Sequence, residues 1–221
     1  MHVLTLLSQK GGSGKTTLAG HLAVQADRTG AGPVGLLDAD PQESLAEWSN
    51  ARSSPAPAFS QTSLWRLGSD VRAMRNRGME LVVVDTPPGI TSTIRGAIDL
   101  SDLIVVPVKP SPHDLRAVAK TIKLVEGLGK PLIFVVNCAS AWANITAETA
   151  IALSQHGTVS PIVIHQRADF ATSMIDGRTV VELPRKSRSV EEVADLWDYL
   201  SDRLNHVHRT SFAPLTTAAS A

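Results

Sequence analysis

SQKGGSGKTT, residues 8–17, is the stretch that decides the fold of this chain. It almost matches the phosphate-binding loop G-x-x-x-x-G-K-[ST], in which backbone amides cradle phosphate groups. Residues 14–16 supply the second half of that pattern. Where the pattern has its first glycine the chain has Gln9, and an additional lysine, Lys10, follows it. The stretch therefore predicts a phosphate cradle with a second cation beside it.

The segments on either side of this loop are those that a phosphate cradle needs. His2–Leu7 is an apolar run typical of a strand, and Lys15–Thr29 has the pattern of a helix that ends at Gly30. Glycines let phosphate approach the backbone, and the start of a helix adds partial positive charge. By the chemistry of the motif, Lys15 reaches the β- and γ-phosphates and the Thr16 hydroxyl binds Mg²⁺.

Strand-like runs and helical patterns alternate along the rest of the chain. This alternation predicts an α/β fold of the P-loop NTPase type, with a mostly parallel twisted sheet and helices on both faces. The expected later strands are Val34–Leu37, Leu81–Val84, Leu103–Val108, Leu132–Val136 and Pro161–Ile164. The expected later helices are Glu43–Ala51, Leu64–Asn76, Leu115–Leu128 and Val190–Leu204, with a loop over Ser53–Ser63.

Polar residues gather where these strands end. Asp38 and Asp40 follow one strand, Asp85 ends the all-apolar run LVVVD, and Asn137 ends another run. Because ligands of parallel sheets bind beyond the carboxyl ends of the strands, these residues are expected to form one site with the loop. Two plainer interpretations stay open, in which the aspartates cap a helix and a turn and Asn137 merely ends its strand.

Composition limits the function further. The chain has 221 residues, a formal net charge of zero and a single cysteine, Cys138. Its length suits one sizeable domain, and one cysteine excludes an internal disulfide and a cysteine-rich metal site. We find no signal peptide and no run long enough to span a bilayer. These features predict a reducing, cytoplasmic setting, and any attraction to nucleic acid must come from a local patch.

Three motifs together give a family resemblance. KGGSGKT, DADPQ and DTPPG resemble the deviant Walker motifs of the ParA/MinD ATPases, and the chain looks most like the small, single-domain plasmid-partition ParA proteins. The resemblance implies one ATPase domain over residues 1–204, followed by a flexible tail over residues 205–221. The chain ends without the basic amphipathic helix with which MinD binds membranes, so we expect no membrane binding.

The resemblance also implies roles for residues. Lys10 is the family's signature lysine, which reaches the phosphates of the other subunit in an ATP-bound sandwich homodimer. Asp40 orients or activates the attacking water, so that Lys10, Lys15 and Asp40 are the expected catalytic residues. The metal residues are Thr16, Asp38 and Asp85, and Asn137 contacts the adenine. The nucleotide-binding set is Lys10, Gly11, Gly12, Ser13, Gly14, Lys15, Thr16, Thr17 and Asn137.

Basic residues concentrate between His165 and Arg188. A solvated face is the plain interpretation of such a run, and a patch for phosphate backbones is the alternative. The same segment resembles the region of plasmid ParA proteins that carries ATP-dependent, nonspecific DNA binding. The positions that match best are Arg167 and Arg188.

The predicted function is therefore that of a ParA-type partition ATPase that uses ATP and Mg²⁺. It would dimerise with ATP, bind DNA nonspecifically on the nucleoid, and be released when a centromere-binding ParB-type partner stimulates hydrolysis. Two alternatives remain: an ATP-dependent metabolic ligase of the dethiobiotin-synthetase type, and a ParA-like ATPase that positions a protein cargo. The sequence names neither cargo nor partner, and it does not separate plasmid from chromosome.

Overall fold

The computed structural model describes residues 1–89, 93–141, 144–184 and 186–211. Its centre is an eight-stranded sheet with the strand order β3-β2-β4-β1-β5-β6-β7, and β8 pairs with β6. Every strand pairing is parallel. The strands are β1 (His2–Leu6), β2 (Val34–Asp38), β3 (Ala58–Gln61), β4 (Leu81–Asp85), β5 (Leu103–Val108), β6 (Leu132–Ala139), β7 (Thr158–Val159) and β8 (Ile164–His165).

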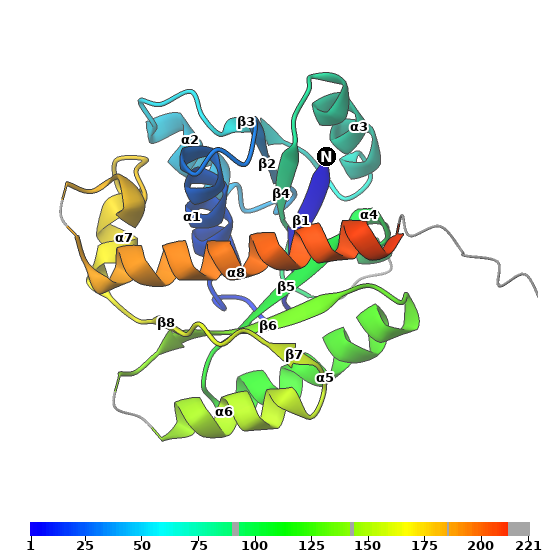
Figure 1. Cartoon of the computed structure of the whole chain (residues 1–221), viewed down its shortest axis with the longest axis vertical. Coiled ribbons are helices and arrows are strands. Elements are labelled where there is room, and N and C mark those ends of the chain that lie inside the picture. Colours follow the sequence, from blue (N-terminus) through cyan, green and yellow to red (C-terminus); the bar gives the residue numbers. More distant parts are fainter. Residues whose placement is uncertain (90–92, 142–143, 185, 212–221) are drawn as a thin grey trace, which may run out of the picture.

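Helices cover both faces of this sheet (Figure 1). One face carries α1 (Lys15–Arg28), α2 (Ser44–Ala51), α7 (Ala168–Met174), the short 3₁₀ helix η1 (Val180–Glu182) and α8 (Arg188–Ser211). The other face carries α3 (Leu67–Asn76), α4 (Ile94–Leu100), α5 (Pro112–Gly127) and α6 (Ile145–Ser154). The predicted fold class, a mostly parallel sheet with helices on both faces, is confirmed.

The central strands feed two separate hydrophobic cores. Along β1, Leu4 and Leu6 pack into the core beneath α1 and α8, whereas Val3 packs into the core beneath α3 and α4. This alternation follows from the two-residue period of a strand. Because helices cover both faces of the sheet, the residues on both sides of β1 are mostly apolar, and β1 is a nearly continuous apolar run in the sequence.

Several elements differ from the sequence-based expectation. β3 (Ala58–Gln61) lies inside the segment expected to be a loop; it is a half-exposed edge strand whose four residues show no apolar period. β8 covers Ile164–His165 instead of the expected Pro161–Ile164. α8 begins at Arg188 and extends to Ser211, past the predicted end of the domain at residue 204. The rest of the predicted tail, residues 212–221, lies outside the described residues.

β1 lies at the point where the chain, after adding strands on one side of the sheet, begins to add them on the other side. β1 lies between β4 and β5, so that the chain builds outward from β1 on both sides. Loops that leave the carboxyl ends of strands diverge at such a point and form a crevice for ligands. The loop after β1, which contains residues 8–14, lies at this crevice.

Candidate functional site

The loop between β1 and α1 has the backbone of a phosphate cradle. Gly12 has φ 74° and Gly14 has φ 90°, a left-handed conformation that favours glycine. A Cβ added at Gly14 would lie 2.3 Å from Asn137 Nδ2, so a larger residue is also excluded by space. α1 begins immediately afterwards at Lys15. The first amides of α1, which have no partner inside the helix, are thus available to an anion.

Lys15, Thr16 and Asp85 form the floor of the loop. The Thr16 hydroxyl donates to Asp85 Oδ2 at 2.6 Å, and Lys15 is 5% exposed. Burial lowers the pKa of Lys15, and the negative charges of Asp85 and Asp40 partly offset this shift. Burial raises the pKa of Asp85 to about 7, against the effects of the Thr16 hydroxyl and the Lys15 ammonium. A charged lysine in such a place is stabilised by any anion that enters the loop.

Asp38 lies beside Asp85, because β2 and β4 are neighbours and these two residues are in register. Asp38 is fully buried, and burial raises the pKa of its carboxyl. Oδ1 accepts from the Asp40 amide at 3.0 Å and Oδ2 from the Ala46 amide at 3.2 Å. Asp38 thereby fixes the backbone between β2 and α2, as the capping interpretation expected. Its predicted role near the metal stays a prediction.

Asp40 is held by a turn at the mouth of the site. Its Oδ1 accepts from the Gln42 amide at 3.0 Å, and the residue is partly exposed. Asp40 raises the pKa of Lys15 and of Asp85 through its charge, so it lies within electrostatic reach of the floor. The turn leaves the Asp40 carboxylate partly exposed beside the floor, where it could orient a water.

The floor fits a magnesium ion bound together with phosphate. Asp85 Oδ1 is buried and has no hydrogen-bond partner among the described residues, and Thr16 supplies a hydroxyl beside it. Within the same ranges, no group of three or more His, Cys, Asp or Glu side chains could hold a metal alone. Mg²⁺ is usually bound through one or two protein oxygens, with the remaining ligands coming from phosphate and water. Thr16 and Asp85 match that pattern.

Lys10 lies outside this floor, at the rim of the loop. Its Nζ contacts Asp114 Oδ2 at 3.0 Å, and its side chain is 48% exposed. Asp114 lies in the first turn of α5, where Ser111 caps the helix by accepting from the Asp114 amide and donates its hydroxyl to Asp114 Oδ2. The sequence pattern pointed to Lys10 but not to this partner, which is 104 positions away along the chain.

Asn137 supports the loop from the end of β6. Its Nδ2 donates to the Ser13 carbonyl at 2.7 Å, and the side chain is buried. A cavity of about 220 Å³ opens next to it, lined by Gly14, Thr17, Leu18, Asn137, Cys138, Ile164, His165, Gln166, Arg167, Phe170 and Ala171. This cavity is in the right place for the base of a nucleotide whose phosphates lie in the loop. The predicted contact of Asn137 with adenine stays a prediction, and the apolar walls from β8 and α7 gave no sequence signal.

Two hydrogen bonds hold the DTPPG segment after β4 against the end of β1 and the phosphate loop. The Thr86 hydroxyl donates to the Leu6 carbonyl at 2.7 Å, and the Gly89 amide donates to the Ser8 carbonyl at 3.1 Å. The bond from Gly89 joins the segment to the phosphate loop, and the bond from Thr86 joins it to the end of β1.

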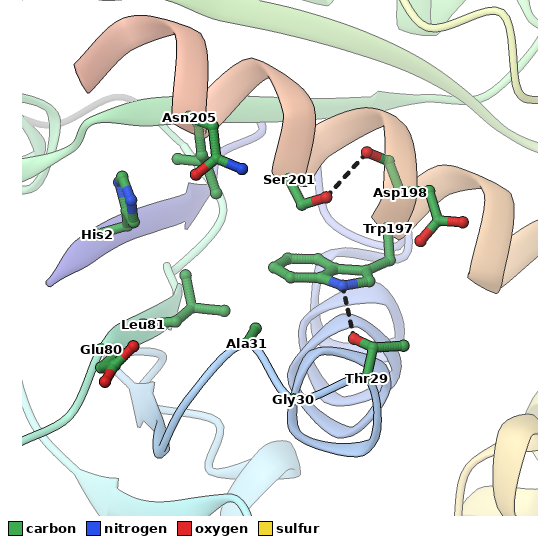
Figure 2. Close-up of a pocket in the computed structure, with 11 residues that line it drawn as sticks. His2, Thr29, Gly30, Ala31, Glu80, Leu81, Trp197, Asp198, Ser201 and Asn205 are labelled. Atoms are coloured by element: carbon green, nitrogen blue, oxygen red, sulfur yellow. Dashed lines mark hydrogen bonds between the residues drawn. The ribbon is translucent and has the colours of Figure 1, made fainter. Parts of the chain in front are cut away.

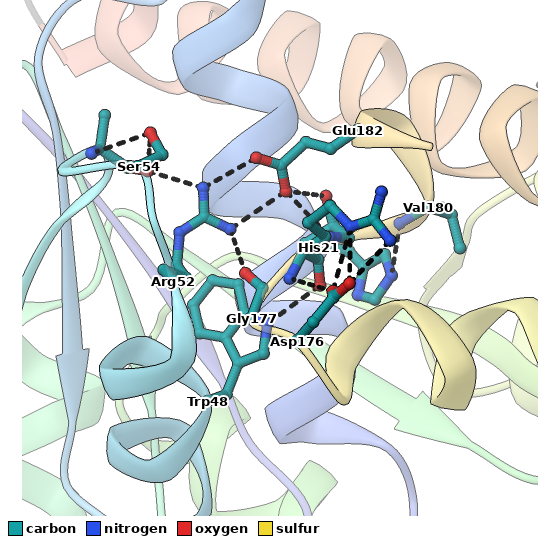
Figure 3. Close-up of polar contacts among 11 residues, drawn as sticks. His21, Trp48, Arg52, Ser54, Asp176, Gly177, Val180 and Glu182 are labelled. Atoms are coloured by element: carbon teal, nitrogen blue, oxygen red, sulfur yellow. Dashed lines mark hydrogen bonds and ion pairs between the residues drawn. The ribbon is translucent and has the colours of Figure 1, made fainter. Parts of the chain in front are cut away.

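His21 lies one helical turn beyond the loop, and Figure 3 shows it near Val180 and Glu182. Its Nδ1 lies 2.7 Å from the Thr17 carbonyl, and the Val180 amide donates to its Nε2 at 3.2 Å. These partners fit a neutral ring with its proton on Nδ1. Complete burial lowers the pKa of His21 to about 4, against the Thr17 carbonyl and the Glu182 charge.

The basic residues of the C-terminal segment are largely paired with acids. Arg167 Nη1 lies 2.6 Å from Glu192 Oε2, and Arg178 Nη2 lies 2.7 Å from Asp176 Oδ2. Arg167 also lines the cavity beside the loop, so its predicted DNA contact stays a prediction and would require Glu192 to release it. Arg188, by contrast, is exposed at the start of α8.

A second cavity lies at the opposite, amino end of the sheet. It has a volume of about 430 Å³ and lies between α8, the end of α1 and the starts of β1 and β4 (Figure 2). Trp197 closes one side, and its Nε1 donates to Thr29 Oγ1 at 3.0 Å. None of the predicted site residues lines it, which leaves the loop edge of the sheet as the candidate site.

Comparisons with known proteins show which family the chain resembles. Nucleotide-binding domains of the CobQ/CobB/MinD/ParA family match residues 4–180. The maintenance of carboxysome distribution protein A of Halothiobacillus neapolitanus is 29% identical over 198 residues, covering 86% of this chain and 91% of that protein. Protein ParA of Rhizobium radiobacter is 30% identical over 127 residues, covering 57% of this chain and 56% of that protein.

Solved structures support the fold. MinD from Aquifex aeolicus superimposes with a TM-score of 0.76 at 19% identity, covering 91% of this chain and 98% of that structure. Within the described ranges, no helix is long and apolar enough to cross a membrane. Because the family match extends over residues 4–180 of 221, this chain belongs to the CobQ/CobB/MinD/ParA family of nucleotide-binding domains.

Proposed function

We propose that this protein is a ParA-type ATPase that dimerises with ATP, binds DNA nonspecifically, and is released when a partner protein stimulates hydrolysis. The observation that carries the proposal is the position of Lys10. Its exposed ammonium lies at the rim of the loop, whereas Lys15 is buried in the floor. A cation at the rim is suited to the phosphates of a second subunit, and charges supplied in this way stabilise phosphoryl transfer elsewhere.

The residues of the floor have separate roles in this proposal. Lys15 neutralises the β- and γ-phosphates, and Thr16 and Asp85 hold the metal, with Asp38 on the neighbouring strand supporting the metal shell. The Mg²⁺ ion, when bound, spreads the negative charge that develops on the transferred phosphoryl group. Asp40 orients the attacking water at the opening of the site. Arg188 is the predicted DNA contact whose side chain is exposed.

The proposed cargo is plasmid or chromosomal DNA, brought by a centromere-binding partner. A second cargo is favoured by a specific similarity: the relative matched over 91% of its length is named for the distribution of carboxysomes. Positioning of a protein body is thus the second candidate, with the same ATP-dependent cycle. The proteins named above are a carboxysome-distribution protein, a ParA protein and a cell-division protein, and none is named as a ligase, which favours either cargo over the metabolic ligase.

The test measures mass and turnover together. Light scattering should give a monomer with ADP and a dimer with a slowly hydrolysed ATP analogue, and ATP hydrolysis should rise when duplex DNA and the partner protein are both added. The same mass with both nucleotides would contradict the sandwich dimer. Turnover that rises with a small carboxylic acid, and not with DNA and partner, would establish the ligase instead.

A further inference from the structure

A groove between α4 and α5 is lined by cations. It has a volume of about 350 Å³, and its lining residues are Arg95, Lys120, Lys123, Leu124, Gly127 and Leu128. Arg95 comes from α4 and the other residues from α5 or its end. Two of the lining residues are leucines, and no acidic side chain is among them.

The cations of α5 form a row. Arg116, Lys120 and Lys123 are separated by four and then three residues, so they lie on one side of the helix, and both lysines are exposed. The row is about 10 Å long at a rise of 1.5 Å per residue. Two further exposed arginines, Arg72 and Arg75, lie on α3, which packs against α4 on the same face of the sheet.

The cations around the groove have no acidic partner within the described ranges. There, Arg95, Arg116, Lys120 and Lys123 take part in no ion pair and stack on no aromatic ring. The acids nearest in sequence do not compensate them: Asp114 contacts Lys10 and Ser111, and neither Asp99 nor Glu126 lines the groove. Like charges four residues apart on a helix repel each other, which makes an isolated row of this kind unfavourable without an anionic ligand.

We propose that the groove between α4 and α5 binds the phosphate backbone of duplex DNA. One strand of a duplex presents a phosphate about every 3.4 Å of axis, so a row of about 10 Å lies beside about three phosphates. Lysine and arginine contacts to phosphate read no sequence, which suits binding to arbitrary DNA. A docked acidic protein would be expected to use an aromatic or large apolar anchor, and the groove offers only Leu124 and Leu128.

This inference rests on the proposed nonspecific DNA binding and adds to the predicted contact at Arg188 a second surface, on the other face of the sheet. It also explains how a chain with zero net charge attracts DNA, since the positive charge of the groove is not cancelled by its own lining residues. In an ATP-dependent dimer the groove is present twice, so that the number of phosphate contacts doubles when the dimer forms.

The experiment compares two variants that each remove two positive charges. Lys120→Gln/Lys123→Gln changes the groove, and Arg28→Gln/Arg203→Gln is the matched control on exposed positions of α1 and α8. The full-length protein with a slowly hydrolysed ATP analogue is titrated with a fluorescent duplex of arbitrary sequence over a range of salt concentrations. Thermal unfolding and basal ATP hydrolysis are measured on every variant to verify folding.

The groove variant should bind DNA roughly tenfold or more weakly, and the slope of log affinity against log salt should decrease by about 0.9 for each phosphate that no longer meets a cation. The control should keep the affinity and slope of the wild type, and Lys120→Arg/Lys123→Arg should restore both. If the wild type bound DNA and the groove variant bound it with the same affinity and salt slope, the inference would be overturned and the proposed function would stand. A wild type that binds no duplex would overturn the proposed DNA binding itself. A groove variant that keeps DNA but no longer binds a polyglutamate peptide would reassign the groove to an acidic protein segment.

Discussion

The floor of the phosphate loop and its rim each carry a lysine, in opposite surroundings. On the floor, Lys15 is 5% exposed and its pKa is lowered by burial. At the rim, the side chain of Lys10 is 48% exposed and pairs with Asp114. Half of the Lys10 side chain stays accessible to water although Asp114 is buried, so the Lys10 ammonium is less completely enclosed than that of Lys15. The rim lysine can therefore leave its partner for a phosphate, while the floor lysine is fixed.

This difference separates two tasks that one loop performs. In the proposed function, the floor would bind the nucleotide of its own subunit, because Lys15 and Asp85 are buried beneath the loop. The rim would contact a second subunit, because the Lys10 side chain is half exposed. Variants of the two regions should consequently affect different steps, and the following predictions test that separation.

The largest effect is expected on the floor. Lys15→Ala should abolish binding of ATP with Mg²⁺, because the cation that balances the β- and γ-phosphates is removed from a buried site. Calorimetry of the monomer measures this, with Arg28→Ala as the control on the exposed end of α1. If Lys15→Ala still bound ATP with micromolar affinity, the floor could not be the phosphate-binding site.

A second prediction separates binding from chemistry. Asp40→Ala should bind ATP as the wild type does and should hydrolyse it roughly 10²-fold more slowly or worse, because the attacking water loses the group that orients it. Steady-state hydrolysis and nucleotide affinity are measured on the same preparation. Unchanged turnover would leave Asp40 with only its hydrogen bond to the Gln42 amide.

The rim variant should show the opposite pattern. Lys10→Ala should retain the ATP affinity of the monomer and weaken the ATP-dependent dimer by roughly 10²-fold, since two charged contacts are removed at about 1.5–3 kcal/mol each. Light scattering across protein concentrations gives the dimer affinity. Loss of ATP binding by the monomer would place Lys10 with the floor and remove the distinction.

The smallest effect concerns His21, beneath the floor. The pKa of His21 is lowered from 6.5 to about 4, so the native state keeps the ring neutral while the unfolded chain takes up a proton below about pH 6.5. The stabilising contribution is present above pH 6.5 and decreases as the pH falls toward 4, by about 2 kcal/mol at pH 5.

The measurement is the difference in unfolding free energy between the wild type and His21→Gln as a function of pH. Taking the difference removes the contribution of Asp38 and Asp85, whose raised pKa values act in the opposite direction as the pH falls. A difference that does not change between pH 8 and pH 5 would mean that His21 is not held neutral.

Local patterns predicted the parts of the fold that local chemistry determines. Glycine spacing located the cradle, and the apolar run ending in Asp85 predicted a central strand with a carboxylate at its end. β3 was missed because a short, half-exposed edge strand depends on its neighbour β2 more than on its own residues. The pairing of Arg167 with Glu192 was missed for a related reason, because it joins α7 to α8 through tertiary structure. Charge in the sequence therefore predicted a DNA surface without showing which charges are unpaired.

The central position of β1 has a consequence for how the protein is made. β1 precedes the other described strands in the sequence, and its two neighbours in the sheet begin only at Leu81 and Leu103. Before Leu81–Asp85 has been synthesised β1 has no partner strand, and before Leu103–Val108 follows it has only one. Chains fold from the N-terminus as they emerge, but here such contacts must wait for distant segments. The loop over residues 8–14 therefore gains strands on both sides of β1 only after β5 has been synthesised.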